Sequence, residues 1–355
     1  MIGYNQIIQL SFGEKMQKYS FLDDYSEGCH LDILNALSKC NFEQDIAYGF
    51  DSYSIEAKKK IKEKINNPSS EIYFVTGGTQ ANLIITSASL RSHEAVVSVE
   101  SGHIAVRESG ALEATGHKII AMPSTNGKLD INIIQEALDS HKAVPHMVKP
   151  KLVYISNATE IGTIYTKEEL REISDFCKEK NLFLFLDGAR LGSALSSNKN
   201  DVTLDDLGKL VDIFTIGATK NGALFGEAIV LNNPLLQEDF NVHIKQRGAL
   251  LAKGRTLGIQ FLELFKENLY FELSQKANNL ALKISEGFEN KNYKLLDKTQ
   301  TNQVFLILPN SLISKLEEKF SFYVWSKYDE ENSVVRMVTS WTTDENKVDE
   351  LISLI

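Results

Sequence analysis

Residues 212–223 read Asp-Ile-Phe-Thr-Ile-Gly-Ala-Thr-Lys-Asn-Gly-Ala, an apolar run that ends in small residues around one lysine. The β-branched and aromatic residues of 213–216 predict a buried strand, with Lys220 just beyond its end. Most lysines lie on solvated loops, but the residues after Lys220 carry no charge until Glu227. Because removing water from an ammonium group is costly, a buried lysine has a lowered pKa and a usable amine nucleophile. Lys220 is therefore a candidate catalytic residue.

A carboxylate is expected beside this lysine. Residues 182–186 are continuously apolar, which is typical of a parallel strand buried on both faces, and Asp187 and Arg190 follow its end. Ligands of open α/β sheets bind at the carboxyl ends of strands. Asp187 precedes Lys220 by 33 residues, the length of one helix and one strand between neighbouring strands. A pyridoxal phosphate site needs this pairing, since an acid keeps the pyridine nitrogen protonated and a lysine binds the cofactor covalently.

Five motifs in order make the chain similar to fold-type I pyridoxal-phosphate enzymes of the β-eliminating lyase and L-threonine aldolase family. The resemblance runs from about Tyr19 to the C-terminus, on the segments Gly77–Asn82, Glu100–His103, Leu186–Arg190, Thr219–Lys220 and Arg336–Thr339. It implies an α/β fold, in which a large domain with a mostly parallel sheet is joined to a smaller C-terminal α+β domain. The expected divisions are an N-terminal extension (1–18), a large cofactor-binding domain (19–255) and a small domain (256–355).

Composition limits the partners and the location. A chain of 355 residues favours two domains, and a net charge of −9 argues against binding to nucleic acid. No apolar run is long enough to span a membrane, and the N-terminus lacks a signal-peptide pattern. Three scattered cysteines are too few for a disulfide framework or a zinc site. We expect a cytoplasmic protein without a metal and without a nucleic-acid or membrane partner.

A glycine turn is the candidate phosphate site. The predicted strand 71–75 runs into Thr76-Gly77-Gly78-Thr79, and helical residues follow. A glycine turn that opens a helix binds anions, because its N–H groups and the helix dipole point at the ligand. A plain turn is equally common on local grounds, and the spacing matches neither a dinucleotide nor a P-loop motif. Together with Lys220 and Asp187, Gly78 and Thr79 are predicted to hold the cofactor phosphate.

The resemblance assigns roles to further residues. His103 follows the predicted strand 95–99; a lone histidine is usually structural, but the family places one here against the pyridine face, where it can also accept protons. Ser26, in a segment that composition alone describes as a turn, is expected to help bind the substrate carboxylate. Arg190 is also expected to contact the cofactor, and it should bind this carboxylate too. So should Arg336, which lies inside an apolar strand and should face a carboxylate because an unpaired buried arginine is costly.

Arg255 belongs to a run of basic residues that by default is a solvated face. In the family the corresponding arginine reaches a cofactor phosphate across a subunit boundary, which implies a homodimer or homotetramer. The chain departs from the family at residues 156–162. Many threonine aldolases carry a histidine there that contacts the β-hydroxyl of the substrate, whereas this chain has Thr159 and Glu160.

The C-terminal part is predicted to form a long helix near 256–289, followed by strand 303–308, helix 311–319, strands 321–325 and 333–339, and helix 344–354. The predicted protein is a pyridoxal-phosphate-dependent carbon–carbon lyase that cleaves L-threonine-like β-hydroxy-α-amino acids to glycine and an aldehyde. A β-eliminating lyase or an aminotransferase would use the same cofactor residues, and product analysis separates the three. A non-catalytic cofactor-binding module is disfavoured, because both Lys220 and Asp187 are present.

Overall fold

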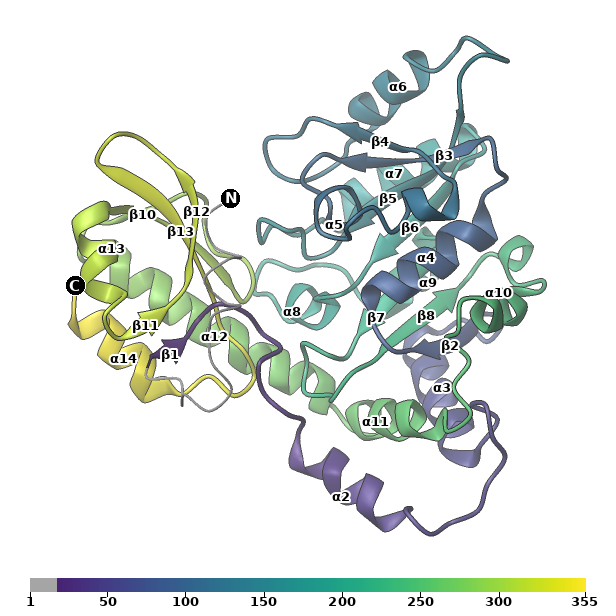
Figure 1. The fold of residues 1–355 in the computed structure, drawn as a ribbon, viewed down its shortest axis with the longest axis horizontal. Helices are drawn as coiled ribbons and strands as arrows, with labels where there is room; N and C mark the ends of the chain where they lie inside the picture. The colour runs from purple at the N-terminus through teal and green to yellow at the C-terminus, as the bar shows by residue number, and fades with distance from the viewer. Residues whose placement is uncertain (1–17) are drawn as a thin grey trace.

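The computed structural model describes residues 18–355 and contains two main sheets, each with its own hydrophobic core (Figure 1). The predicted N-terminal extension therefore lies almost wholly outside the described residues. The larger sheet has the strand order β2-β8-β7-β6-β5-β3-β4, and the smaller has the order β12-β13-β10-β9. This is the α/β fold with a smaller second sheet that the sequence predicted.

The larger sheet is mostly parallel. Its strands are β2 (Glu71–Val75), β3 (Glu94–Val99), β4 (Ile119–Met122), β5 (Lys149–Ser156), β6 (Phe183–Asp187), β7 (Ile213–Gly217) and β8 (Glu227–Leu231). β4, β3, β5, β6 and β7 are parallel to one another, while β8 is antiparallel to both β7 and β2. The carboxyl ends of β5, β6 and β7 therefore lie at the same edge of the sheet.

Helices cover both faces of this sheet. The helices before the small domain are α2 (Leu31–Lys39), α3 (Ser52–Ile65), α4 (Gly78–Ser89), α5 (His103–Val106), α6 (Ile131–Asp139), α7 (Lys167–Glu179), α8 (Leu191–Leu195), α9 (Leu204–Leu210), α10 (Phe240–Gln246) and α11 (Arg255–Phe265). Two of them begin at threonines that satisfy free N–H groups, Thr166 for α7 and Thr203 for α9. α3, α7 and α9 pack on one face, and α4 and α10 on the other.

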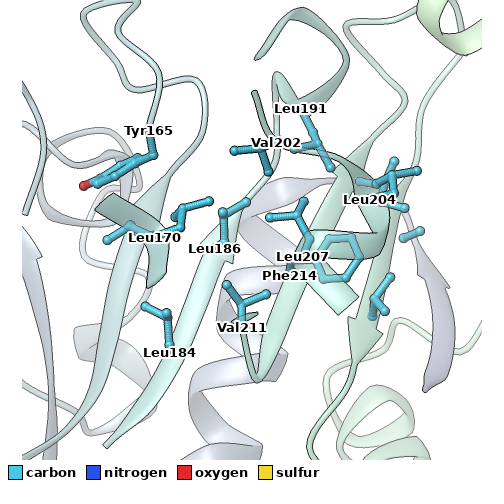
Figure 2. Packing of buried hydrophobic residues seen from close by; sticks show 14 of the residues in the cluster. Tyr165, Leu170, Leu184, Leu186, Leu191, Val202, Leu204, Leu207, Val211 and Phe214 are labelled. Atoms are coloured by element: carbon cyan, nitrogen blue, oxygen red, sulfur yellow. The ribbon is translucent and has the colours of Figure 1, made fainter. Parts of the chain in front are cut away.

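Successive residues of the central strands enter opposite cores, which explains the continuously apolar sequence of β6. Leu184 and Leu186 pack in the core shown in Figure 2, where Phe214 of β7 also lies. Phe185, between the two leucines, belongs to the core on the other face. A strand buried on both sides has no polar face, so its sequence does not alternate.

The small domain contains α12 (Leu269–Glu289), β9 (Lys294–Leu295), β10 (Gln303–Pro309), α13 (Asn310–Leu316), β11 (Phe320–Ser321), β12 (Tyr323–Lys327), β13 (Asn332–Val338) and α14 (Glu345–Ser353). Its elements follow the predicted order closely. β1 (Tyr19–Ser20) pairs in parallel with β11, and Phe21 is part of the small-domain core. The start of the described chain thus packs with its end.

The single helix predicted over 256–289 is wrong. α11 ends at Phe265, and α12 begins after Asn268. α11 packs against α3 in the core of the large sheet, whereas α12 contributes Tyr270 to that core and Leu280 to the small-domain core. The polar residues 266–268 allow the change of direction that these two packing partners require. The division into residues 1–18, 19–255 and 256–355 stays a prediction.

Within residues 18–355, no helix is both long enough and apolar enough to cross a membrane.

Candidate active site

The end of β6 presents a buried carboxylate. Asp187 is 5% exposed, and its Oδ2 accepts hydrogen bonds from the Tyr154 hydroxyl at 2.7 Å and from Asn82 Nδ2 at 3.3 Å. The Ala189 N–H donates to Oδ1 at 2.8 Å. Three donors hold the side chain in one orientation. Asp187 can therefore act as a fixed anion for a protonated ligand group.

Lys220 lies in the tight connection between β7 and β8, where the Ala218 N–H donates to the Gly226 oxygen at 3.0 Å. Among the described residues, its Nζ makes no hydrogen bond or ion pair. Burial, followed by the positive charge of Arg190, lowers the pKa of Lys220, while Asp24 and Asp187 oppose that shift. The amine is thus buried among charges without being bound to one, which suits covalent attachment of a carbonyl ligand.

The N-terminus of α4 offers an anion site. Gly77 is the residue before the helix and makes no side-chain cap, and Gly78 and Thr79 open the first turn, whose N–H groups have no partner within the helix. A Cβ atom added at Gly77 or Gly78 would meet no heavy atom within 4 Å, so space is open beside this turn. An anion in this space would accept hydrogen bonds from the free N–H groups.

His103 is held by a buried carboxylate. Its Nδ1 lies 2.9 Å from Glu108 Oε1, and the Glu108 side chain is 0% exposed. Asn82 Nδ2 donates to the same Glu108 oxygen at 2.7 Å and also reaches Asp187, so it links the two carboxylates. Sequence reasoning gave no role to Asn82, Glu108 or Tyr154. Asn82 lies within the Gly77–Asn82 motif and Glu108 follows His103 by five residues, which are the only local signals of their importance.

Arg190 forms a bidentate ion pair with Asp24. Its Nε donates to Asp24 Oδ2 at 2.7 Å and its Nη2 to Oδ1 at 2.9 Å. Asn302 Nδ2 adds a third hydrogen bond to Asp24 at 2.9 Å. Two of the five N–H donors of Arg190 are therefore engaged by the protein, and the predicted contact of Arg190 with a substrate carboxylate would have to use Nη1 or the second N–H of Nη2.

Arg336 is a half-buried cation for which the described residues supply no anion. It lies on β13 with its guanidinium 5.4 Å from the Tyr323 ring centre and 5.3 Å from that of Trp325. No carboxylate among residues 18–355 forms an ion pair with it, and its Nε is buried without a partner. Burial, followed by the charge of Arg190, lowers the pKa of Arg336 to about 10. A ligand carboxylate would remove this electrostatic cost.

Comparison with known proteins identifies the family of this chain. A model of the β-eliminating lyase family matches residues 23–311. The chain belongs to that family. A low-specificity L-threonine aldolase from a Pseudomonas species is 31% identical over 342 residues, which cover 94% of this chain and 96% of the relative. A solved structure of threonine aldolase from Leishmania major matches with a TM-score of 0.93 and 46% identity, over 95% of this chain and 98% of the other.

A solved aspartate aminotransferase from Thermus thermophilus shares the fold of this protein, with a TM-score of 0.72 at 12% identity. As a member of its family, the protein is a pyridoxal-phosphate-dependent enzyme. The residues present fit the cofactor. Lys220 has a free amine for covalent attachment, Asp187 is a fixed anion for the ring nitrogen, and open space adjoins the free N–H groups at Gly78.

Two predicted site residues, Ser26 and Arg255, and Thr159, where the sequence departs from the family, form no hydrogen bond or ion pair with that cluster in the described part of the chain. Ser26 is exposed, and its hydroxyl donates to Asp23 Oδ1 at 2.7 Å. Arg255 begins α11 and donates from Nη1 to the backbone oxygen of Glu43 at 2.6 Å. Thr159 is buried in a turn, with its Oγ1 2.7 Å from that of Thr163. The roles of Ser26 and Arg255 stay predictions.

Proposed function

We propose that this protein cleaves the Cα–Cβ bond of β-hydroxy-α-amino acids such as L-threonine or L-allo-threonine, releasing glycine and an aldehyde. The observation that carries the proposal is Arg336, a half-buried guanidinium that no carboxylate of the described residues pairs with, in a site that also holds Lys220 and Asp187. An α-carboxylate is the anion that an amino acid would bring. The threonine aldolases of the Pseudomonas species and Leishmania major support the choice of substrate.

The protein side chains have distinct tasks in this reaction. Lys220 and Asp187 would hold the cofactor, which when bound accepts the electron pair released at Cα. Arg336 binds the substrate carboxylate and so restricts which bond to Cα can break. The ion pair with Asp24 holds the guanidinium of Arg190 in place. The β-hydroxyl must lose a proton as the Cα–Cβ bond breaks, so the site also needs a proton acceptor.

Product analysis of the holoenzyme on a panel of β-hydroxy amino acids tests the proposal. Glycine and the matching aldehyde in equal amounts support it. Pyruvate with ammonia would show elimination, and a keto acid without ammonia would show transamination; either result as the main outcome overturns the proposal. Lys220→Ala is the control, because it should lose both product formation and the covalent link to cofactor that borohydride reduction fixes.

We also propose that the enzyme is a cytoplasmic homodimer or homotetramer in which Arg255 acts across an interface. Exposed apolar side chains support this assembly, and they gather in the segment around α2, which projects from the body of the protein (Figure 1): Leu31, Leu34, Phe42, Ile46, Phe50 and Ile55. Such a surface is typical of protein–protein contact. Light scattering that reports a fully active monomer would refute it.

A further inference from the structure

Glu160 has one bound and one free carboxylate oxygen. It follows β5, and its Oε1 accepts the His103 N–H at 2.9 Å and the Ser156 hydroxyl at 2.9 Å. Its Oε2 is buried without a hydrogen-bond partner among the described residues. Buried carboxylate oxygens normally have partners, so an unpaired one requires an explanation.

The two hydrogen bonds decide where a proton can sit. A carboxylate oxygen has two lone pairs, and both donors use those of Oε1. A neutral Glu160 therefore carries its proton on Oε2, and an ionised Glu160 accepts a proton there. In both the neutral and the ionised form, Oε2 is the oxygen at which Glu160 loses or gains a proton, and its proton partner must come from outside the described residues.

The surroundings of Glu160 belong to the active site. Glu160 interacts electrostatically with Asp187 and Arg190 at the end of β6 and with Tyr154 on β5. The backbone N–H of His103, at the start of α5, donates to Oε1 of Glu160. Tyr165 also interacts electrostatically with Glu160. Burial raises the pKa of Glu160, and the charge of Asp187 raises it further, against the hydrogen bonds from Ser156 and His103. The carboxyl thus titrates closer to neutral pH than an exposed glutamate.

Other acid–base groups of the cluster are less suited to meet a substrate. The Tyr154 hydroxyl is engaged by Asp187, and Nδ1 of His103 by Glu108. Nε2 of His103 stays available, but the family resemblance places this ring flat against the cofactor. Glu108 and Glu227 also have an unpartnered oxygen, but these residues are 6% and 3% exposed, whereas Glu160 is only half-buried. Of these three carboxyls with an unpartnered oxygen, Glu160 is therefore the one least enclosed by the protein.

We propose that Glu160 is the catalytic base, whose Oε2 takes the proton of the substrate β-hydroxyl as the Cα–Cβ bond breaks. The O–H bond breaks, the carbon–oxygen bond becomes the carbonyl of the aldehyde, and the electron pair of Cα–Cβ stays with Cα. A solvent proton then completes glycine, and Glu160 returns its proton to water. This inference rests on the proposed function, because it assumes a substrate with a β-hydroxyl.

Glu160→Gln tests the assignment, with Glu113→Gln as the matched control on an exposed helix. The amide keeps an oxygen that accepts from His103 and Ser156, but it cannot take a proton. We expect kcat for cleavage to fall about 100-fold or more, with KM changed little, because general base catalysis contributes factors of this size. Exchange of the glycine α-proton with deuterium, followed by NMR, should stay within about threefold of wild type, because it needs the carboxylate contact but no β-hydroxyl.

The pH profile gives a second readout. In the wild-type enzyme kcat/KM should rise with pH as Glu160 ionises, and this limb should be absent in Glu160→Gln. Glu160→Asp keeps an acid and should retain the limb with a lower rate, which tests the assignment even if the glutamine variant fails to fold. Two results overturn the assignment of Glu160 but leave the proposed function standing. One is cleavage by Glu160→Gln within about threefold of wild type, and the other is an equal loss of cleavage and exchange. Wild-type enzyme that releases no aldehyde overturns the proposed function and this assignment with it.

Discussion

Replacing Asp24 by alanine should destabilise the protein strongly, because it would leave Arg190 buried and unpaired. The Asp24 side chain is 1% exposed, and that of Arg190 is 14% exposed. Their two hydrogen bonds, at 2.7 and 2.9 Å, join the segment after β1 to the turn after β6. Asn302 extends the contact to the start of β10.

Removal of one partner of a buried ion pair costs about 3–5 kcal/mol, since the remaining charge loses its compensation. Here the loss is expected in the upper part of that range. The charge of Arg190 already disfavours the charged forms of Lys220 and Arg336, so an unpaired Arg190 would face two other cations. Against a typical total of about 5–15 kcal/mol, the change is a large share of the stability.

Urea unfolding of wild type, Asp24→Ala and Asp23→Ala measures the effect. Asp23 is the control, because it is a neighbouring carboxylate whose contacts, with the Tyr25 N–H and the Ser26 hydroxyl, are local and exposed. Its loss should cost about 1 kcal/mol or less. A loss below about 1 kcal/mol in Asp24→Ala, or equal losses in the two variants, would refute the reasoning.

The same pair predicts a pH dependence. Burial alone would raise the pKa of Asp24, but the charges of Arg190 and Lys220, with the hydrogen bonds, lower it below its ordinary value of 3.8. A carboxyl with a lowered pKa contributes stability that is complete above the ordinary value and is lost as pH falls through the folded value. The difference in unfolding free energy between wild type and Asp24→Ala should therefore be constant between about pH 6 and 8 and shrink below about pH 4.

Two further substitutions test the electrostatics of the site. Arg336→Ala should raise KM and lower kcat, with a combined loss of about 2–5 kcal/mol in kcat/KM, and a loss below about 1 kcal/mol would place the carboxylate elsewhere. Burial, together with the charge of Asp187, raises the pKa of Glu227 to about 8 from an ordinary value of 4.5. The folded protein then retains a proton that the unfolded chain releases, so wild-type stability should fall relative to Glu227→Gln as pH rises from 4.5 to 8. Urea unfolding at several pH values measures this, and an unchanged difference would contradict the shift.

The sequence by itself determined the architecture, and it supplied the prediction for the centre of the site. Apolar runs such as 182–186 indicate strands buried on both faces, because a strand without a solvent-exposed face does not alternate between apolar and polar residues. Each such strand ends in polar residues, and the carboxyl ends of neighbouring parallel strands share one edge of the sheet. Asp187 and Lys220 could therefore be paired before any contact was known. The order of five short motifs then indicated the family.

Only the tertiary structure decided which side chains hold these residues in place. Asp24 pairs with Arg190 across 166 residues, and Asn82 reaches Asp187 across 105. Sequence periodicity reports which face of an element is buried, but it carries no information on which distant polar groups meet. The same limit explains the missed break between α11 and α12, because their direction is set by two separate cores. The free oxygen of Glu160 likewise depends on where Ser156 and the His103 N–H donate, which only the folded chain determines.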